Sequence, residues 1–350
     1  MKITPNNFDL IRLFAAFQVV LIHSATHLHI PMGLINYLSY FPGVPIFFFT
    51  SGFLISLSWE KNPSIKFYAS NRALRIFPAL WVCLIFSLFV LFIGAKEPIS
   101  LDIGNFIAWL TGQLSFVQFY NPDYFRAFGV GVLNGSLWTI TVELQFYFII
   151  PMIYLFSCID RFIILISLVS MAIFIASNVY ADVYENYTLY KLLQVSFLPW
   201  LWMFLAGTLV QRHFKTITPY IQGKFFVILI LFIMVLLASN EFGLKVNANE
   251  LNPIYFFALI ALILAVSFNK RELADKLLKR NDYSYGIYIY HMPIINLMVE
   301  YSLTGKYSYF AMAILLTITM GILSWHFVER GSLKMKKYIN KSIYDHQVKS

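Results

Sequence analysis

Residues 8–23 read FDLIRLFAAFQVVLIH, and this stretch indicates the fold class of the whole chain. It is long and apolar, yet it contains Arg12 and His23, eleven residues apart. In a helix, eleven steps of about 100° bring both side chains onto one face, about 16 Å apart along the axis. An ionisable residue inside a membrane-spanning helix is costly and usually marks a functional site. The stretch therefore predicts a spanning helix with Arg12 near one membrane surface and His23 deeper toward the other.

The composition of the chain is that of a membrane protein. Of the 350 residues, 59% are hydrophobic and only 12% are charged, and the mean hydropathy is +0.69. A soluble domain would carry about twice that share of charged residues. The net charge of +9 fits the excess of Lys and Arg in cytoplasmic loops, so it does not indicate a nucleic-acid partner. The two cysteines, Cys83 and Cys158, lie in or beside apolar segments and indicate neither a disulfide nor a metal site.

Ten segments are long and apolar enough to be read as spanning helices, which need about 20 residues. They are residues 8–28, 37–58, 74–94, 137–157, 161–179, 192–211, 224–240, 252–268, 283–301 and 307–328. With these spans, 21 of the 26 Lys and Arg residues fall on one side of the membrane and 5 on the other. The sequence therefore predicts an all-α, polytopic membrane helix bundle of about ten transmembrane helices with both termini in the cytoplasm.

The predicted domain organisation is simple. Residues 1–330 form a single transmembrane domain, and residues 331–350 form a short basic cytoplasmic tail, which we expect to lie against anionic lipid. The longest connection, about 95–136, is expected on the extracytoplasmic side. Its segment 105–110 is expected to lie along the membrane interface or to re-enter the membrane.

Three residues are candidates for the chemistry. His23 is a candidate general base, because a neutral imidazole takes a proton from a hydroxyl near neutral pH. Glu143 lies about two turns into the span 137–157, at the expected depth of His23, and could orient its imidazole. Each has a structural alternative. His23 could be a hydrogen-bonding group between helices, Glu143 could be protonated and bond a backbone carbonyl, and Arg12 could be a snorkelling anchor at the membrane edge.

A second candidate site lies at the cytoplasmic end of the span 74–94. Arg72 and Arg75 are three residues apart and so share a helix face. Paired guanidinium groups suit phosphate, although any cytoplasmic loop carries such residues. For His291, in the span 283–301, lining the site and structural hydrogen bonding remain equally open.

Taken together, these motifs resemble the acyltransferase-3 family of integral membrane O-acyltransferases. The Arg-then-His spacing matches at Arg12 and His23, and the arginine pair matches at Arg72 and Arg75. The Ser-Leu-Trp…Glu motif matches from Ser136 to Glu143. The resemblance covers nearly the whole chain and is to the stand-alone type, which lacks a C-terminal hydrolase-like domain.

The resemblance implies a multi-pass acyltransferase of the bacterial cytoplasmic membrane. It would move an acyl group, usually acetyl, from acyl-CoA to a hydroxyl of a surface glycan or a lipid-linked sugar precursor, without a metal. In this interpretation His23, Glu143 and Arg12 are the catalytic set, and Arg72 and Arg75 bind the donor. His23 would either take the proton of the acceptor hydroxyl or receive the acyl group itself. The alternative is a transporter or exporter of a lipid-linked or small-molecule substrate, and a third possibility is a non-catalytic scaffold.

Overall fold

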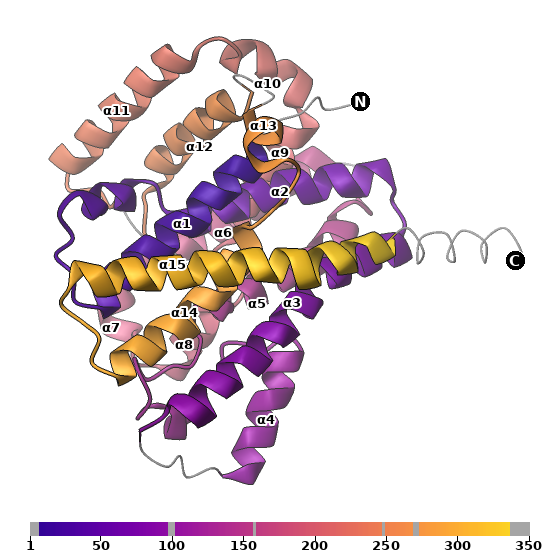
Figure 1. Cartoon of the computed structure of the whole chain (residues 1–350). Helices are drawn as coiled ribbons and strands as arrows, with labels where there is room; N and C mark the ends of the chain where they lie inside the picture. The colour runs from indigo at the N-terminus through magenta and orange to yellow at the C-terminus, as the bar shows by residue number, and fades with distance from the viewer. Residues whose placement is uncertain (1–6, 97–101, 157–158, 247–248, 269–272, 337–350) are drawn as a thin grey trace, which may run out of the picture. The chain divides into compact units, whose positions relative to one another are not determined.

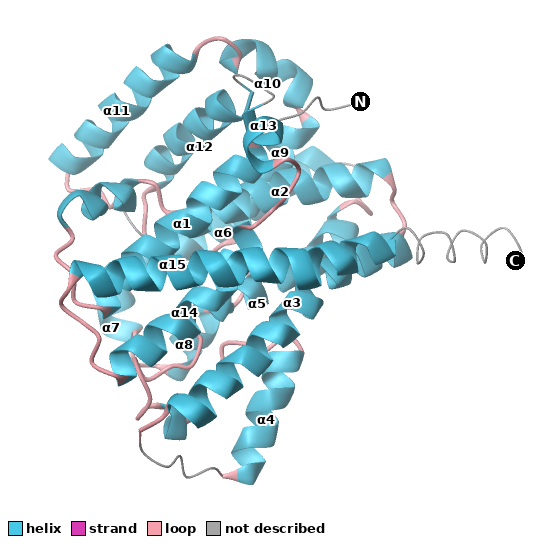
Figure 2. Cartoon of the chain, in the orientation of Figure 1, coloured by secondary structure: helices cyan, strands magenta, loops and turns pink. Residues whose placement is uncertain are grey.

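The computed structural model describes residues 7–96, 102–156, 159–246, 249–268 and 273–336, which are mostly helical and contain no β-strand (Figure 1, Figure 2). Contacts divide the chain into two compact units. The first is made of the described residues of Met1–Gln18, Asn36–Lys61 and Gln145–Asp282. The second is made of those of Val19–Ile35, Asn62–Leu144 and Tyr283–Ser350. The expected tail residues 337–350 and Cys158 lie outside the described residues.

Six helical segments of the described part are long and apolar enough to cross a membrane. They are Phe8–His27, Gly33–Lys61, Ile65–Gly94, Gly135–Ile153, Ile159–Val179 and Tyr307–Lys336. A seventh exists if α10 (Phe214–Ile221) and α11 (Phe225–Glu241), which meet at 89°, form one span. The chain is therefore an all-helical multi-pass membrane protein, while the ten spans and their orientation stay predictions.

The first unit is centred on the contact between α2 (Gly43–Lys61) and α9 (Leu201–Arg212). Gly52 and Gly207 let the two backbones approach closely. A Cβ atom at Gly52 would lie 1.8 Å from the carbonyl oxygen of Phe204, and one at Gly207 would lie 2.1 Å from that of Phe49. Small residues at helix contacts are a common packing device in membranes, where hydrophobic burial does not drive helices together.

Helix α9 is shorter than the segment 192–211 predicted for it. The helix α8 (Thr188–Gln194) ends first, and α9 begins only at Leu201. Pro199 accounts for the break, because it has no N–H and disfavours helical geometry at the residue before it. Two side chains bond the backbone groups left free by the break. Gln145 donates to the carbonyl of Val195 and accepts from the N–H of Phe197. Ser170 donates to the carbonyl of Leu198 and accepts from the N–H of Trp202.

In the second unit, α14 (Ser284–Glu300) is buried along almost its whole length and packs against α15 (Tyr307–Ser324) and α3 (Ile65–Gly94). Pro293 lies inside α14 and leaves the carbonyl of Ile289 without an intrahelical donor. Asn134 Nδ2 donates to that oxygen at 2.9 Å, and Cys83 Sγ lies 3.2 Å from it. The proline thus creates an acceptor that attaches the segment before α5 (Trp138–Ile153) to α14.

The segment 105–110, expected at the membrane interface or re-entrant, belongs to α4 (Ile103–Leu114), which contacts α3. Asp102 caps α4 by accepting from the N–H groups of Gly104 and Asn105. The remaining described elements are α1 (Phe8–His27), α6 (Ile159–Val179), α7 (Ala181–Tyr184), α12 (Pro253–Phe268), α13 (Leu273–Leu278), a π-helical segment (Trp325–Glu329) and the 3-10 turns Gly33–Tyr40, Asp123–Phe125 and Gly135–Leu137.

Candidate active site

His23 lies in the part of α1 that belongs to the second unit, and its side chain is half-buried. Its Nδ1 is 3.0 Å from Nε2 of His291, and the ring centroids are 5.2 Å apart. His291 has no exposed surface, and its Nδ1 is 2.5 Å from the carbonyl oxygen of Tyr288 on the preceding turn of α14. The structure therefore gives His23 a histidine neighbour that the sequence analysis left without a role.

Glu143 lies in α5, in the same unit, and is half-buried. It is close enough to Tyr68 and Tyr288 to interact with both electrostatically. Tyr288 also bonds the motif that contains Glu143, since its hydroxyl is 2.8 Å from Thr139 Oγ1 and 3.2 Å from the carbonyl oxygen of Ser136. The expected pairing of Glu143 with His23 stays a prediction, and the partner described for Nδ1 of His23 is His291.

Arg72 and Arg75 lie in the first turns of α3 and are half-buried. Lys336, on the helical segment that follows α15, is close enough for its charge to interact with both. Three cations so close together repel one another, and an anion bound among them would relieve that repulsion. The positive charge gathered here is that expected of an anion site, and its cytoplasmic location stays a prediction.

A series of polar side chains leads from this basic cluster toward His23 within the second unit. Arg72 and Glu143 both interact electrostatically with Tyr68, and Glu143 also interacts with Tyr288. His291 contacts the backbone carbonyl of Tyr288 and Nδ1 of His23, and the ring centroids of Tyr288 and His291 are 5.8 Å apart. Polar groups inside a membrane protein face the bundle interior or a pathway, so this arrangement is the one expected for a buried site.

Arg12 lies in the part of α1 that belongs to the first unit and pairs with Asp282 at 2.8 Å. The two side chains are 17% and 12% exposed, so the ion pair is largely buried. This contact supports a structural role for Arg12, which the sequence analysis had left open. A direct role of Arg12 in the chemistry stays a prediction.

Removing either charge of this pair should destabilise the protein. We expect Arg12→Met and Asp282→Leu each to lower the free energy of unfolding by about 2 kcal/mol, because each removes one charge from a largely buried ion pair. The double variant should lose less than the sum of the two single losses. Denaturant titration of the four proteins measures this, and strictly additive losses would exclude an energetic coupling between the two side chains.

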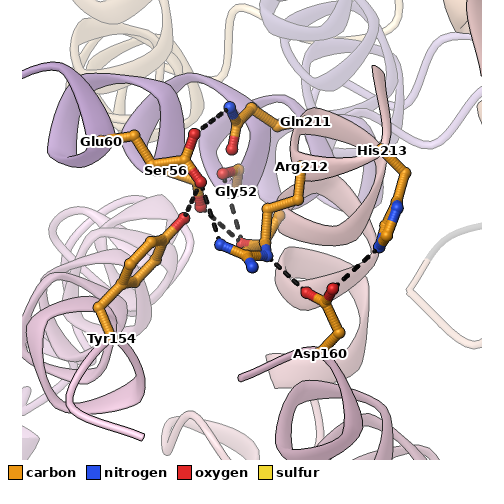
Figure 3. A network of polar contacts seen from close by, with 9 residues as sticks. Gly52, Ser56, Glu60, Tyr154, Asp160, Gln211, Arg212 and His213 are labelled. Atoms are coloured by element: carbon orange, nitrogen blue, oxygen red, sulfur yellow. Dashed lines mark hydrogen bonds and ion pairs between the residues drawn. The ribbon is translucent and has the colours of Figure 1, made fainter. Parts of the chain in front are cut away.

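A polar network that the sequence analysis missed joins four helical segments of the first unit (Figure 3). Arg212, in the last turn of α9, bonds Asp160 at 2.5 Å and Glu60 at 3.1 Å. Tyr154 and Gln211 donate to Glu60, and His213 lies 3.2 Å from Asp160. Glu60, Asp160 and Arg212 are ordinary charges outside the predicted spans when taken one by one. Their convergence shows that they hold helix ends together.

The described residues contain no group of three or more His, Cys, Asp or Glu side chains arranged to hold a metal ion. The fold and the site thus define a multi-pass helical membrane protein with an imidazole pair in its interior and a separate cluster of cations. Residues 6–329 match the family Acyl_transf_3, described as an acyltransferase domain, and the chain belongs to this family.

Two relatives are similar to the chain over nearly its full length. It is 30% identical to Nodulation protein 10 of Rhizobium leguminosarum bv. viciae, with 95% of this chain and 94% of the relative covered. It is 28% identical to the O-acetyl transferase of Shigella phage Sf6, with 94% and 96% covered. The O-acetyltransferase OatA of Staphylococcus aureus is 25% identical over 83% of this chain and 52% of its own length.

No solved structure matches the chain significantly. Membership of the family, together with relatives named O-acetyltransferases, makes the chain an O-acyltransferase. An enzyme is therefore favoured over the transporter and the scaffold considered from the sequence.

Proposed function

We propose that this O-acyltransferase moves an acetyl group from acetyl-CoA to a hydroxyl of a cell-surface polysaccharide or its lipid-linked precursor. The names of the relatives support acetyl as the group transferred. The observation that carries the proposal is the half-buried imidazole of His23, held through Nδ1 in the same unit as the basic cluster. The proposed location is the bacterial cytoplasmic membrane, with ten spans, both termini in the cytoplasm, and residues 1–330 acting as one domain.

In the proposed reaction, acetyl-CoA enters from the cytoplasm and its phosphates bind Arg72 and Arg75. Planar guanidinium groups bond phosphate oxygens in pairs, and Lys336 adds a third positive charge. The pantetheine arm extends along the polar series toward His23. Glu143 is proposed to stabilise the imidazolium that forms on His23, and Arg12 to hold α1 through Asp282.

His23 then acts as general base. It removes the proton from the acceptor hydroxyl while the oxygen attacks the thioester carbonyl carbon. The tetrahedral intermediate collapses, the C–S bond breaks, and the thiolate of CoA leaves with the proton returned by His23. Direct transfer of this kind consumes one acyl-CoA and one hydroxyl and yields one ester and one CoA.

The test is an acyl-transfer assay on the purified protein in lipid nanodiscs with radiolabelled acetyl-CoA. We expect release of CoA that depends on added glycan or lipid-linked sugar, together with label in that acceptor. Comparison of surface glycans from cells with and without the protein would identify the acceptor. A protein that releases no CoA and labels no acceptor with any acyl-CoA would contradict the proposal.

The donor site has its own prediction. We expect Arg72→Ala to raise the apparent KM for acetyl-CoA about tenfold and to change kcat less, since a charged hydrogen bond to phosphate is worth about 1.5–3 kcal/mol. Lys66→Ala is the matched control, because Lys66 is exposed on the first turn of the same helix. Equal KM values for the two variants would mean that Arg72 marks only the topology of the chain.

A further inference from the structure

The hydrogen bonds of His291 determine where the protons of both imidazoles lie. A carbonyl oxygen has no proton to give, so the short contact between His291 Nδ1 and the Tyr288 carbonyl requires the proton on Nδ1. In a neutral ring Nε2 is then an acceptor with a free lone pair. A second proton on this ring would place a positive charge at a side chain with no exposed surface, which is very costly.

The same reasoning then applies to His23. Since Nε2 of His291 accepts, Nδ1 of His23 must carry the proton that donates across the 3.0 Å contact. The neutral ring of His23 therefore keeps its lone pair on Nε2. The hydrogen bond described for His23 uses Nδ1, so Nε2 is the nitrogen that this contact leaves for a substrate.

The geometry points to His291 as a positioning residue that holds His23 in the Nδ1–H tautomer, so that Nε2 serves as the base. This inference rests on the proposed function of His23. The acceptor that a carboxylate provides in a Ser-His-Asp triad is provided here by a second imidazole, which is itself oriented by a backbone carbonyl of α14. When His23 gains the substrate proton on Nε2, its Nδ1–H bond to His291 becomes charge-assisted and strengthens.

The position of His291 in α14 suits this role. Along the helix, His291 follows Tyr288, whose carbonyl it contacts. It precedes Pro293, which frees the carbonyl of Ile289 for Asn134 and Cys83. Almost every residue around it in the helix is buried, so the ring has a single defined environment. A rigid positioning group keeps a base in the productive orientation without spending free energy during the reaction.

Two substitutions separate this role from simple packing. His291→Leu removes the acceptor, whereas His291→Gln keeps a neutral side chain whose amide oxygen can accept from His23 Nδ1. We expect His291→Leu to lower kcat by about 10²-fold, because a base in the wrong tautomer cannot take the substrate proton. The KM for acetyl-CoA should change little, because donor binding does not depend on this tautomer. We expect His291→Gln to be at least tenfold faster than His291→Leu. Met292→Leu, a buried neighbour on the same helix, is the packing control and should resemble the wild type.

A spectroscopic measurement tests the tautomer without relying on activity. The chain has 7 histidines, so ¹⁵N-histidine labelling gives few signals, and those absent from His23→Gln belong to His23. We expect Nδ1 of His23 to be protonated and Nε2 unprotonated in the wild type, and a mixed population in His291→Leu. An unprotonated Nδ1 in His23, equal rates for His291→Leu and His291→Gln, or a wild-type kcat in a well-folded His291→Leu protein would each overturn the inference. If instead the wild type transfers no acyl group while the expected tautomer is found, the proposed function fails, and with it the role of Nε2 as base, while the tautomer held by His291 is still established.

Discussion

The His23→Ala protein is expected to insert normally and to transfer acetyl groups at least about 10²-fold more slowly than the wild type. The expected loss is that of a general base, which contributes about 10²–10⁴-fold to turnover. The effect should appear in kcat, because the imidazole acts on the acceptor hydroxyl and has no part in binding the phosphates of the donor. The measurement is the steady-state rate of CoA release in nanodiscs, with the amount of inserted protein matched between samples.

The control for this substitution is His326→Ala. His326 is an exposed histidine of the π-helical segment, and its Nε2 lies 3.4 Å from the Tyr283 hydroxyl. The His326→Ala protein should keep the wild-type rate, which would show that removing a histidine does not by itself slow the reaction. A His23→Ala protein that inserts normally and keeps its full rate would remove His23 from the mechanism.

A second large effect is expected from Gly52→Ala in the contact between α2 and α9. The added methyl group would overlap the backbone of Phe204, since its position is 1.8 Å from that carbonyl oxygen. Backbone atoms of a helix have no rotamer with which to move aside, so the two helices must separate. We expect a loss of about 3 kcal/mol or more in the free energy of unfolding, at the upper end for overpacked contacts.

The comparison for Gly52→Ala is Gly331→Ala, because a Cβ atom at Gly331 meets nothing within 4 Å. That variant should be at least as stable as the wild type, since alanine favours a helix over glycine by about 1 kcal/mol. Denaturant titration in detergent measures both, and size-exclusion chromatography reports any loss of the folded form. Equal stability of the two variants would show that α2 and α9 are not in backbone contact at Gly52.

Much of this architecture was predictable because its signals are local. Helices that bury their own backbone groups are the only open-chain structures stable in lipid, so long apolar segments alone predict the all-helical fold. His23 stands out for the same reason, since an ionisable group costs free energy wherever it enters such a segment. The length of α9 was predicted wrongly because Pro199 breaks an otherwise apolar run, and side chains such as Gln145 satisfy the break from another helix.

Local sequence signals could not predict which groups the polar residues contact. His23 and His291 are 268 residues apart, and Arg12 and Asp282 are 270 apart, so neither pair leaves a periodic signal in the chain. Depth in the membrane makes Glu143 a candidate partner for His23, and this pairing stays a prediction, since several groups share a given depth. Which of them meet depends on how the helices rotate and pack.

The sequence alone was enough to show that the chain enters a membrane as helices. It also singled out His23, an ionisable residue that is costly inside an apolar segment, and Arg72 and Arg75, two cations close together in the chain. The tertiary structure decided which groups the ionisable residues contact. His23 meets His291 in the second unit, and Arg12 meets Asp282 in the first. The physical reason is that the two effects act over different ranges. The cost of placing a polar group in lipid acts on each residue where it lies in the chain, whereas a hydrogen bond acts only within about 3 Å and forms after distant helices have packed.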